Sequence, residues 1–352
     1  MKNYVIYSKE YPKQFYTDFL FRYESVLDIL RGLSDLTLKE LYEVIEPPKI
    51  TLEDCGIIHD TRYLQELKNR AERDERLKEA LSWDLIGTSG TIFASEIALK
   101  RGMAYHLGGG FHHAFRDKEG DYDLLNDIAV AVQWMREKHN LKKIMIIDLD
   151  VHHANGTQSI FYNDPGVLQI SFHGWGIFPG SGDVNEIGEG EGKGYKINLP
   201  LLRDTSDETY LYAMDKIIPY FIEEYKPQLI IYQAGVDLLV KDPVGNLKLT
   251  LDGAYKRDRK IKEFAAGYPI AVIRGGGYNN EYSPKANINT LAAFADLPLI
   301  FSYQKKMSEP KKCMRWAERK ITELKSILKE YWNFDIDIHA ENTESKNKKI
   351  LV

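Results

Sequence analysis

Short apolar runs alternate with helical segments through the middle of the chain, and this pattern constrains the fold most. The apolar runs cover residues 143–149, 167–172, 228–232 and 269–273. Apolar residues at helical spacing predict helices over residues 91–101, 126–138, 208–225 and 252–265. Strands that are apolar on both faces and separated by helices form parallel sheets covered on both sides. The predicted fold class is therefore α/β, with a single-domain parallel β-sheet sandwiched by helices.

The chain length supports one domain. With 352 residues, the chain is near the upper limit for one hydrophobic core, so we expect one elaborated α/β domain over residues 1–334. An amphipathic helix is predicted over 311–332. Residues 335–352 are polar and are expected to form a loosely held C-terminal tail.

Composition excludes several classes of protein. A net charge of −5 and a pI near 6.0 give no global basic face, which disfavours sequence-independent binding to nucleic acid. The two cysteines, Cys55 and Cys313, cannot build a disulfide framework or a cysteine zinc site. The N-terminal MKNYVIYSKEYPK lacks an apolar leader, and no run of 18 apolar residues predicts a membrane span. We therefore expect a cytoplasmic protein.

Histidine and acidic residues gather where the predicted strands end. The segments are GGGFHHA (108–114), DLDVHHANG (148–156), SFHG (171–174), QAGVD (233–237) and RGGGY (274–278). Five of the nine histidines lie in the first three segments. Ligands of open parallel sheets bind outside the carboxyl ends of the strands. The functional site is therefore predicted at this edge.

The segment DLDVHH favours a metal site. Asp148, Asp150 and His152 are two residues apart, so on a strand they would share one face. Two carboxylates on one face repel each other unless a cation or hydrogen-bond donors lie between them. A divalent metal bound by carboxylate and imidazole meets this need. The alternative is a pair of capping or ion-paired aspartates followed by incidental histidines.

The other segments are weaker when taken singly. The three glycines of GGGFHHA let backbone approach a ligand closely, and His112 and His113 follow them. The alternative is a glycine turn beside two structural histidines. Asp237 ends QAGVD, where a capping aspartate is common. Tyr278 follows RGGG, and a tyrosine alone is more often a packed aromatic.

Together, in their order and spacing, these motifs resemble the zinc-dependent histone deacetylases of the arginase/deacetylase superfamily. The likeness is greatest to the class IV group and its bacterial relatives, and it covers residues 87–281. It implies the arginase/deacetylase fold. It also implies an activity: hydrolysis of the amide of acyl-lysine side chains, where the acyl group is acetyl or longer. Metal-activated water would attack the amide with a histidine as general base. Hydroxamate-type inhibitors would be expected to bind.

The resemblance implies two cation sites. The zinc ligands would be Asp150, His152 and Asp237. This donor set is also suitable for Fe²⁺. Asp148 would orient the first histidine of the pair and, together with Ser171, would contribute to a structural K⁺ site.

The resemblance also assigns the groups that move protons. His113 would be the general base for water and then the acid for the leaving amine, and His112 would give electrostatic support. Tyr278 would hydrogen-bond the scissile carbonyl. Asn155 stands where class I members have an aspartate beside the second histidine. A neutral partner should leave His113 less basic than an aspartate would.

Five residues would line the acyl-lysine tunnel: Gly110, Asp121, Tyr122, Phe178 and Val244. Tyr122 and Phe178 correspond to two aromatic walls. Asp121 replaces a residue that is commonly glycine; it could pair with a cationic substrate or be an exposed loop residue. Val244 lies in the loop where relatives that deacetylate polyamines carry an acidic gatekeeper. Val244 argues against a polyamine and Asp121 argues for one, so both substrate classes stay open.

Two other functions compete with lysine deacylation. One is a small-molecule amidohydrolase acting on an acetylated polyamine or related metabolite. The other is a catalytically inactive acyl-lysine-binding module, which the complete set of ligands, histidines and Tyr278 disfavours. A two-metal arginase-like site would need further acidic ligands, and Ala154 stands where one is required. His153 is expected to be a packed or supporting residue, and His173 to lie near the monovalent cation site.

Overall fold

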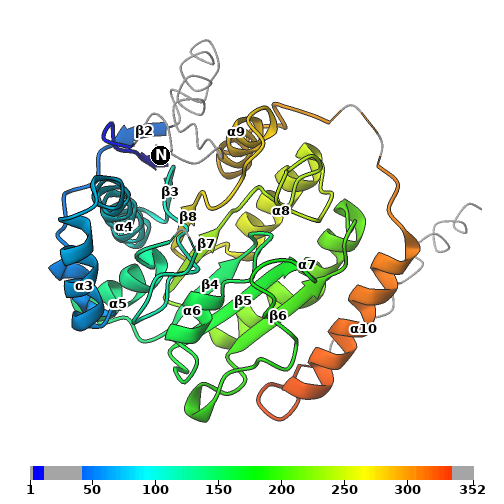
Figure 1. The fold of residues 1–352 in the computed structure, drawn as a ribbon. Coiled ribbons are helices and arrows are strands. Elements are labelled where there is room, and N and C mark those ends of the chain that lie inside the picture. Colours follow the sequence, from blue (N-terminus) through cyan, green and yellow to red (C-terminus); the bar gives the residue numbers. More distant parts are fainter. Residues whose placement is uncertain (1–2, 12–41, 122, 304, 306, 335–352) are drawn as a thin grey trace, which may run out of the picture.

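All described strands of the computed structural model belong to one parallel sheet (Figure 1). The structure describes residues 3–11, 42–121, 123–303, 305 and 307–334. The strands are β1 (Asn3–Ile6), β2 (Tyr42–Ile45), β3 (Met103–His106), β4 (Ile144–Asp148), β5 (Val167–Gly174), β6 (Lys196–Leu201), β7 (Leu229–Gln233) and β8 (Ile270–Ile273). Their order in the eight-stranded sheet is β2-β1-β3-β8-β7-β4-β5-β6. Every neighbouring pair runs parallel, which confirms the predicted fold class.

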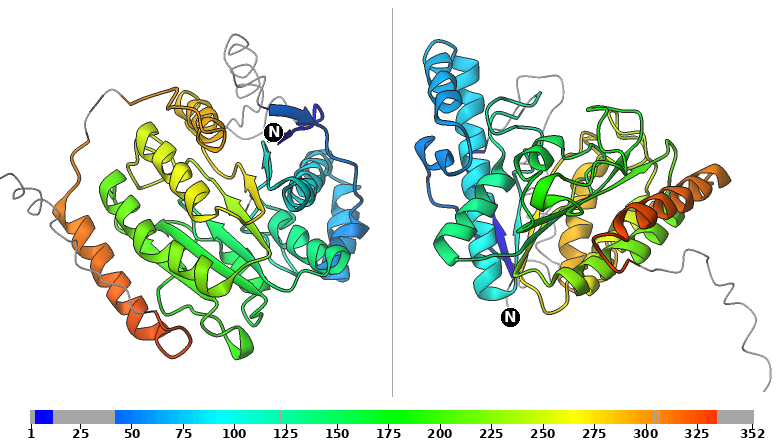
Figure 2. Two further views of the ribbon diagram at one scale, coloured as in Figure 1. Left: turned by 180° about the vertical axis from the view of Figure 1, so that it is seen from behind. Right: turned by 90° about the horizontal axis from the view of Figure 1, so that it is seen from below.

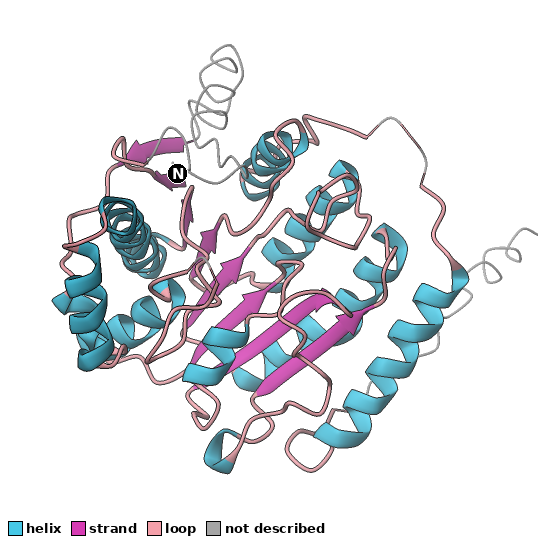
Figure 3. Cartoon of the chain, in the orientation of Figure 1, coloured by secondary structure: helices cyan, strands magenta, loops and turns pink. Residues whose placement is uncertain are grey.

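Helices cover both faces of this sheet (Figure 3). They are α3 (Thr61–Ala71), α4 (Glu75–Arg101), α5 (Asp127–His139), α6 (Asn155–Ile160), α7 (Asp207–Tyr225), α8 (Leu251–Phe264), α9 (Tyr282–Phe294) and α10 (Lys311–Leu328), with short 3-10 turns η1 (Glu53–Ile57) and η2 (Gly190–Gly192). Apolar residues of α3 to α6 pack on one face, and those of α7 to α10 pack on the other. Figure 2 shows the two layers, blue and cyan on one side and green to orange on the other. No described helix has the length and apolar character needed to cross a membrane.

Strand β4 shows why the apolar runs predicted the sheet so well. Alternate residues of β4 enter different cores: Ile144 and Ile146 pack with α3 to α6, and Met145 and Ile147 pack with α7 to α10. Both faces are dry, so the run contains no polar residue until Asp148. Burial of each such side chain contributes on the order of 2 kcal/mol relative to exposure.

Helix α4 is much longer than expected. The prediction began at residue 91, but the helix begins at Glu75, where the Asp74 side chain accepts hydrogen bonds from the backbone N–H groups of Arg76 and Leu77. The segment GTSGT (87–91) resembles a loop, yet it is buried. A Cβ on Gly90 would lie 2.1 Å from Nε2 of His106. Small residues are needed there because the helix lies directly against strand β3.

Two predicted boundaries need correction, and one of them lies at the functional edge. Strand β4 ends at Asp148, so Asp150 and His152 follow the strand rather than share a face of it. The turn has its own cause: the backbone N–H of Asp150 bonds to Oδ1 of Asp148, and that of His152 bonds to Oδ1 of Asp150. The last helix ends at Leu328 instead of residue 332. The predicted tail, 335–352, lies outside the described residues.

Candidate active site

The segments singled out in the sequence meet at one edge because their strands are neighbours. Strands β3, β8, β7 and β4 are adjacent in the sheet, and all are parallel. The loops that follow them therefore leave the sheet at the same edge (Figure 1). This brings together residues more than 120 positions apart, such as Asp150 and Gly276, whose N–H donates to Oδ2 of Asp150 at 2.9 Å.

Asp150, His152 and Asp237 form a compact buried group. One ligand atom from each residue lies within 4.8 Å of the others. Nδ1 of His152 is 3.2 Å from Oδ1 of Asp150 and 3.2 Å from Oδ2 of Asp237. The predicted ligands therefore converge, although a turn and not a shared strand face brings two of them together.

The group has properties that fit a bound metal ion. Oδ1 of Asp237 accepts the N–H of Val151 at 2.9 Å, but Oδ2 is buried and has no hydrogen bond of suitable geometry from the described residues. Burial, and then the charge of Asp150, raise the pKa of Asp237 to about 7. Burial alone would lower the pKa of His152, but Asp150 and Asp237 outweigh it and raise the pKa to about 10. Two carboxylates and one imidazole that are short of positive charge could hold a metal ion.

His112 and His113 lie beside this group and form a hydrogen-bonded chain. Nδ1 of His112 is 2.9 Å from Oδ2 of Asp148, and its Nε2 is 3.1 Å from Nε2 of His113. Nδ1 of His113 is 2.7 Å from Oδ1 of Asn155. The network is satisfied when His112 carries two protons and His113 carries one, on Nδ1.

The two histidines differ in basicity. Burial would lower the pKa of His112, but the Asp148 carboxylate outweighs it and raises the pKa to about 9. Burial, followed by the charge of His112, lowers the pKa of His113 well below 6.5, and the neutral Asn155 compensates only in part. The pair thus combines a cationic imidazole with a neutral one that retains a lone pair on Nε2.

Gly110 is required for the close approach of two loops. It adopts φ +91°, and a Cβ there would lie 2.7 Å from Cα of Gly275. Its N–H donates to the buried Asp127 at 2.9 Å, and its carbonyl accepts from Nε2 of Gln233 at 3.2 Å. These contacts set the position of the histidine pair that follows.

Tyr278 is half-buried and is held through its backbone. Its N–H donates to Oδ2 of Asp242 at 2.8 Å, while Oδ1 of Asp242 accepts from Val244 and Gly245 at 3.0 and 3.3 Å. Asp242 thereby joins the tyrosine loop to the loop that carries Val244. Burial and the nearby Asp237 raise the pKa of Tyr278 well above 10, so its phenol stays protonated and can donate.

Of the remaining predicted lining residues, Phe178 lies directly beside this centre. Phe178 is 43% exposed, and its ring centroid is 4.8 Å from that of His113. Val244 is half-buried. Asp121 is exposed with φ +51°, a conformation that glycine adopts without strain. Tyr122 lies outside the described residues.

The residues of the predicted monovalent cation site are also brought together. Asp148 and Ser171 are register partners on β4 and β5 and are fully buried. Oγ of Ser171 is 3.0 Å from Nδ1 of His173. His153 is buried, as expected, and its ring packs 4.8 Å from that of His173.

Sequence reasoning missed several residues that hold this site in place. Asp123 accepts the N–H of His113 at 2.8 Å, and Asp127 accepts those of Gly110 and Phe111. Asp242 accepts the N–H of Tyr278 in the same way, whereas Gln233 donates to the carbonyl of Gly110. Gln233 could have been found as a polar residue that ends an apolar strand. The others carry no local signal, because their partners are distant in the sequence or are backbone groups.

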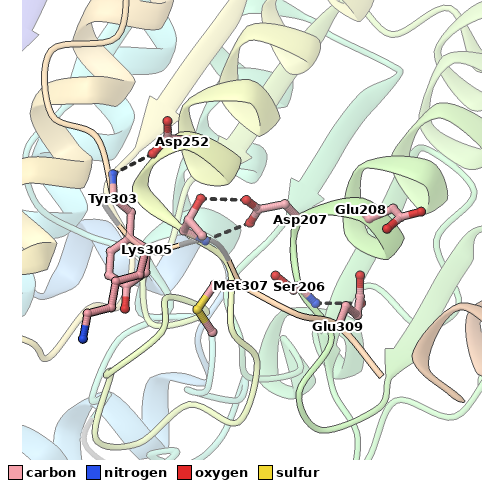
Figure 4. Close-up of a pocket in the computed structure, with 9 residues that line it drawn as sticks. Ser206, Asp207, Glu208, Asp252, Tyr303, Lys305, Met307 and Glu309 are labelled. Carbon is pink, nitrogen blue, oxygen red and sulfur yellow. Dashed lines mark hydrogen bonds between the residues drawn. The ribbon is translucent and has the colours of Figure 1, made fainter. Parts of the chain in front are cut away.

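A second acid-lined hollow lies at the N-terminal ends of α7 and α8 (Figure 4). Its lining residues are Ser206, Asp207, Glu208, Thr250, Asp252, Tyr303, Lys305, Met307 and Glu309. It shares no residue with the Asp150–His152–Asp237 group. Asp207, Asp252 and Glu309 accept backbone N–H groups, as in the bond from Tyr303 to Asp252 at 2.7 Å.

Comparison with known proteins places the chain in a family. The family model described as histone deacetylase domain matches residues 20–294. A probable deacetylase of Archaeoglobus fulgidus is 32% identical over 315 residues, covering 82% of this chain and 86% of the relative. The acetoin utilization protein AcuC of Staphylococcus aureus is 31% identical, covering 74% and 73%. The chloroplastic histone deacetylase 10 of Oryza sativa is 30% identical, covering 86% and 74%. The chain is therefore a member of the histone deacetylase family and an enzyme of the hydrolytic deacetylase type.

Proposed function

We propose that this protein is a zinc-dependent deacylase that hydrolyses the amide of acyl-lysine side chains, with His113 as general base. The observation that carries the proposal is the position of the histidine pair against the buried Asp150–His152–Asp237 group. The ring centroids of His113 and His152 are 6.0 Å apart. A neutral base and a candidate metal site thus lie side by side. We assign the activity to a catalytic domain of residues 1–334.

The residues divide the chemistry as follows. A Zn²⁺ ion at Asp150, His152 and Asp237, with Fe²⁺ as an alternative, would supply a Lewis acid for the acyl carbonyl and the attacking water. Nε2 of His113 accepts a proton from the water as it attacks, and then donates that proton to the leaving amine. The products are a carboxylic acid and a free amine.

His112 and Tyr278 stabilise charge in this scheme. His112 remains cationic because Asp148 raises its pKa to about 9. Its positive charge would stabilise the negative charge that develops when water attacks the amide. The phenol of Tyr278 donates to the oxyanion that develops on the scissile carbonyl. Asn155 accepts from Nδ1 of His113 and so keeps the proton on Nδ1 and the lone pair on Nε2.

A structural K⁺ at Asp148 and Ser171 belongs to the same proposal. The two residues are adjacent on paired strands and fully buried, and Asp148 also accepts the backbone N–H of Asp150 at 3.1 Å. A cation bound there would offset the second carboxylate of the DLD segment. The proposed location of the enzyme is the cytoplasm, which fits two buried, unpaired cysteines.

The substrate proposal depends on the residues around the entrance. Phe178 provides an exposed aromatic surface next to His113, and Val244 is apolar, as suits the methylene chain of a lysine. The alternative substrate is an acetylated polyamine or related metabolite, because Asp121 presents an exposed carboxylate to a cationic substrate. The intact histidine pair and metal group disfavour an inactive binding module.

A hydrolysis screen of the purified, zinc-loaded protein tests the proposal. The panel comprises acetyl-, trifluoroacetyl- and long-chain acyl-lysine peptides and acetylated polyamines, each with and without a hydroxamate. Hydroxamate-sensitive release from the peptides is the expected result. Turnover of polyamines alone would transfer the assignment to the small-molecule amidohydrolases. No turnover of any compound, with zinc bound, would favour the binding module.

A further inference from the structure

Arg257 is a fully buried cation in helix α8, and nothing in the proposed chemistry uses it. Its side chain has no exposed surface. A buried guanidinium requires a counter-charge and acceptors for its five N–H donors, or it destabilises the fold. The adjacent Asp258, itself fully buried, provides the counter-charge through Oδ1 at 2.8 Å from Nε of Arg257.

Two further donors of Arg257 reach the loop that carries Asp237. Nη1 donates to the carbonyl of Gly235 at 2.5 Å, and Nη2 donates to the carbonyl of Ala234 at 3.3 Å. Strand β7 ends at Gln233, so these two carbonyls have left the sheet ladder. A buried carbonyl needs a donor, and the planar fork of an arginine can serve two at once.

The same loop passes very close to the other carboxylate of the metal group. A Cβ added to Gly235 would lie 2.4 Å from Oδ2 of Asp150 and 2.8 Å from its Cα. Any shift of the Ala234–Gly235 backbone would therefore move Asp237 and press on Asp150 together. The guanidinium is hydrogen-bonded to the two peptide carbonyls that set the separation of the Asp150 and Asp237 carboxylates.

The Arg257–Asp258 pair is itself anchored to two other elements. The hydroxyl of Tyr232 on β7 donates to Oδ1 of Asp258 at 2.5 Å, and that of Thr290 on α9 donates to Oδ2 at 2.6 Å. The carboxylate thus has a fixed position, and so does the guanidinium bound to it. Thr290 holds Oδ2 independently of Tyr232, so the loss of one hydroxyl leaves the pair anchored.

We propose that Arg257 is a positioning residue that holds the Ala234–Gly235 backbone and thereby sets the geometry of the Asp150–His152–Asp237 metal group. The inference rests on the metal site of the proposed function. Substitutions that disturb the support of metal ligands typically weaken metal binding about 10- to 100-fold. Arg257→Lys should therefore raise the Zn²⁺ dissociation constant by about that factor, because a lysine keeps the charge but cannot bond both carbonyls.

The test compares Arg257→Lys with a matched control in the same network. Tyr232→Phe removes a hydrogen bond of Asp258 but leaves the two carbonyl contacts of Arg257 intact. For each protein, Zn²⁺ affinity is measured by competition with a chromogenic chelator, and thermal unfolding is recorded with and without metal. The visible spectrum of the Co²⁺-loaded protein reports the ligand geometry directly. If Arg257→Lys fails to fold, the double variant Arg257→Gln, Asp258→Asn is used instead. It removes both charges of the buried pair together, so no unpaired charge is left in the core.

The expected result is weaker Zn²⁺ binding and an altered Co²⁺ spectrum for the Arg257 variants, with both properties unchanged in Tyr232→Phe. Equal metal affinity in Arg257→Lys and the original protein would overturn the inference while leaving the proposed function intact. An equal loss in Tyr232→Phe would also overturn it, because the effect would then be one of general stability. Failure of the original protein to bind metal would instead remove the proposed metal site and the inference with it.

Discussion

The molecule has two acid-rich places at the same edge of its sheet, and they differ in how their carboxylates are satisfied. In the hollow at α7 and α8, Glu309 accepts the N–H of Ser206 at 2.8 Å (Figure 4) and that of Thr209 at 3.2 Å. Asp207 accepts both the N–H and the hydroxyl of Thr250. These acids cap helices and tie a loop to the domain, and the geometry there requires no ion.

The Asp150–His152–Asp237 group is the opposite case. The carboxylates face each other and an imidazole, and Oδ2 of Asp237 is buried without a suitable hydrogen bond from the described residues. A buried, unsatisfied carboxylate oxygen is costly unless a cation accompanies it. The comparison teaches that acidic density alone does not indicate a metal site, whereas buried carboxylates that converge on an imidazole, with an oxygen lacking a suitable hydrogen bond, fit one.

The largest expected effect is that of Asp237→Ala on metal content. The change removes the unsatisfied oxygen and one of three candidate ligands, so Zn²⁺ affinity should fall by more than about a hundredfold, beyond the usual effect of supporting residues. Metal analysis after dialysis checks this, with Asp207→Ala as the matched acid from the other cluster. A full complement of metal in Asp237→Ala would remove the distinction between the two places.

His113→Ala separates the chemistry from the metal. Turnover should fall by about 10²- to 10⁴-fold, the usual contribution of a general base, while the metal content stays at the level of the original protein. Steady-state rates and metal analysis on the same preparation give both numbers. Retained turnover would show that another group accepts the proton.

Adding a carboxylate beside the base should shift its titration. The pKa of His113 lies below its ordinary value, because of burial and the charge of His112, so the base stays neutral and active below pH 6.5. In Asn155→Asp a negative partner would raise that pKa by about one unit or more. The acidic limb of the kcat/KM profile should then move to higher pH. An unchanged profile would mean that the limb reports a different group.

The smallest effect is expected in the hollow. Glu309→Gln weakens one of two hydrogen bonds to the start of α7, so the free energy of unfolding should fall by about 1–2 kcal/mol, as for a bond to a charged group. Metal content and turnover should not change. Chemical denaturation with metal analysis tests this, and a loss of metal would show that the two acidic places are coupled.

The sequence predicted the central sheet because burial on both faces leaves a clear apolar pattern. It missed β6, whose buried residues include Lys196 and Asn198. Nζ of Lys196 donates to the carbonyl of Val167 at 2.7 Å, and burial lowers its pKa to about 7. A strand that buries an ammonium against backbone carbonyls does not show an apolar run, so its pattern resembles that of a loop.

The residues of the candidate site also fall into two groups, those that the sequence predicted and those that it did not. Metal-binding and proton-transfer residues were predicted because histidine and aspartate gather in short segments at strand ends. Asp242 and Arg257 could not be predicted, because each acts on backbone groups of another segment. The bond between Asp242 and the N–H of Tyr278 spans 36 positions and leaves no trace in either local sequence.

The strand order has a consequence for how the protein is made. Strand β8 lies between β3 and β7, although it is the last of the eight to leave the ribosome. From His106 at the end of β3 to Ile273 at the end of β8, synthesis at about 5–20 residues per second takes roughly 10 to 30 seconds. During that interval β3 presents an unpaired edge to other nascent chains, and β7, which ends at Gln233, presents one for roughly the last 2 to 8 seconds. Chaperone binding to stalled chains that end before residue 270 should therefore exceed binding to chains that include β8.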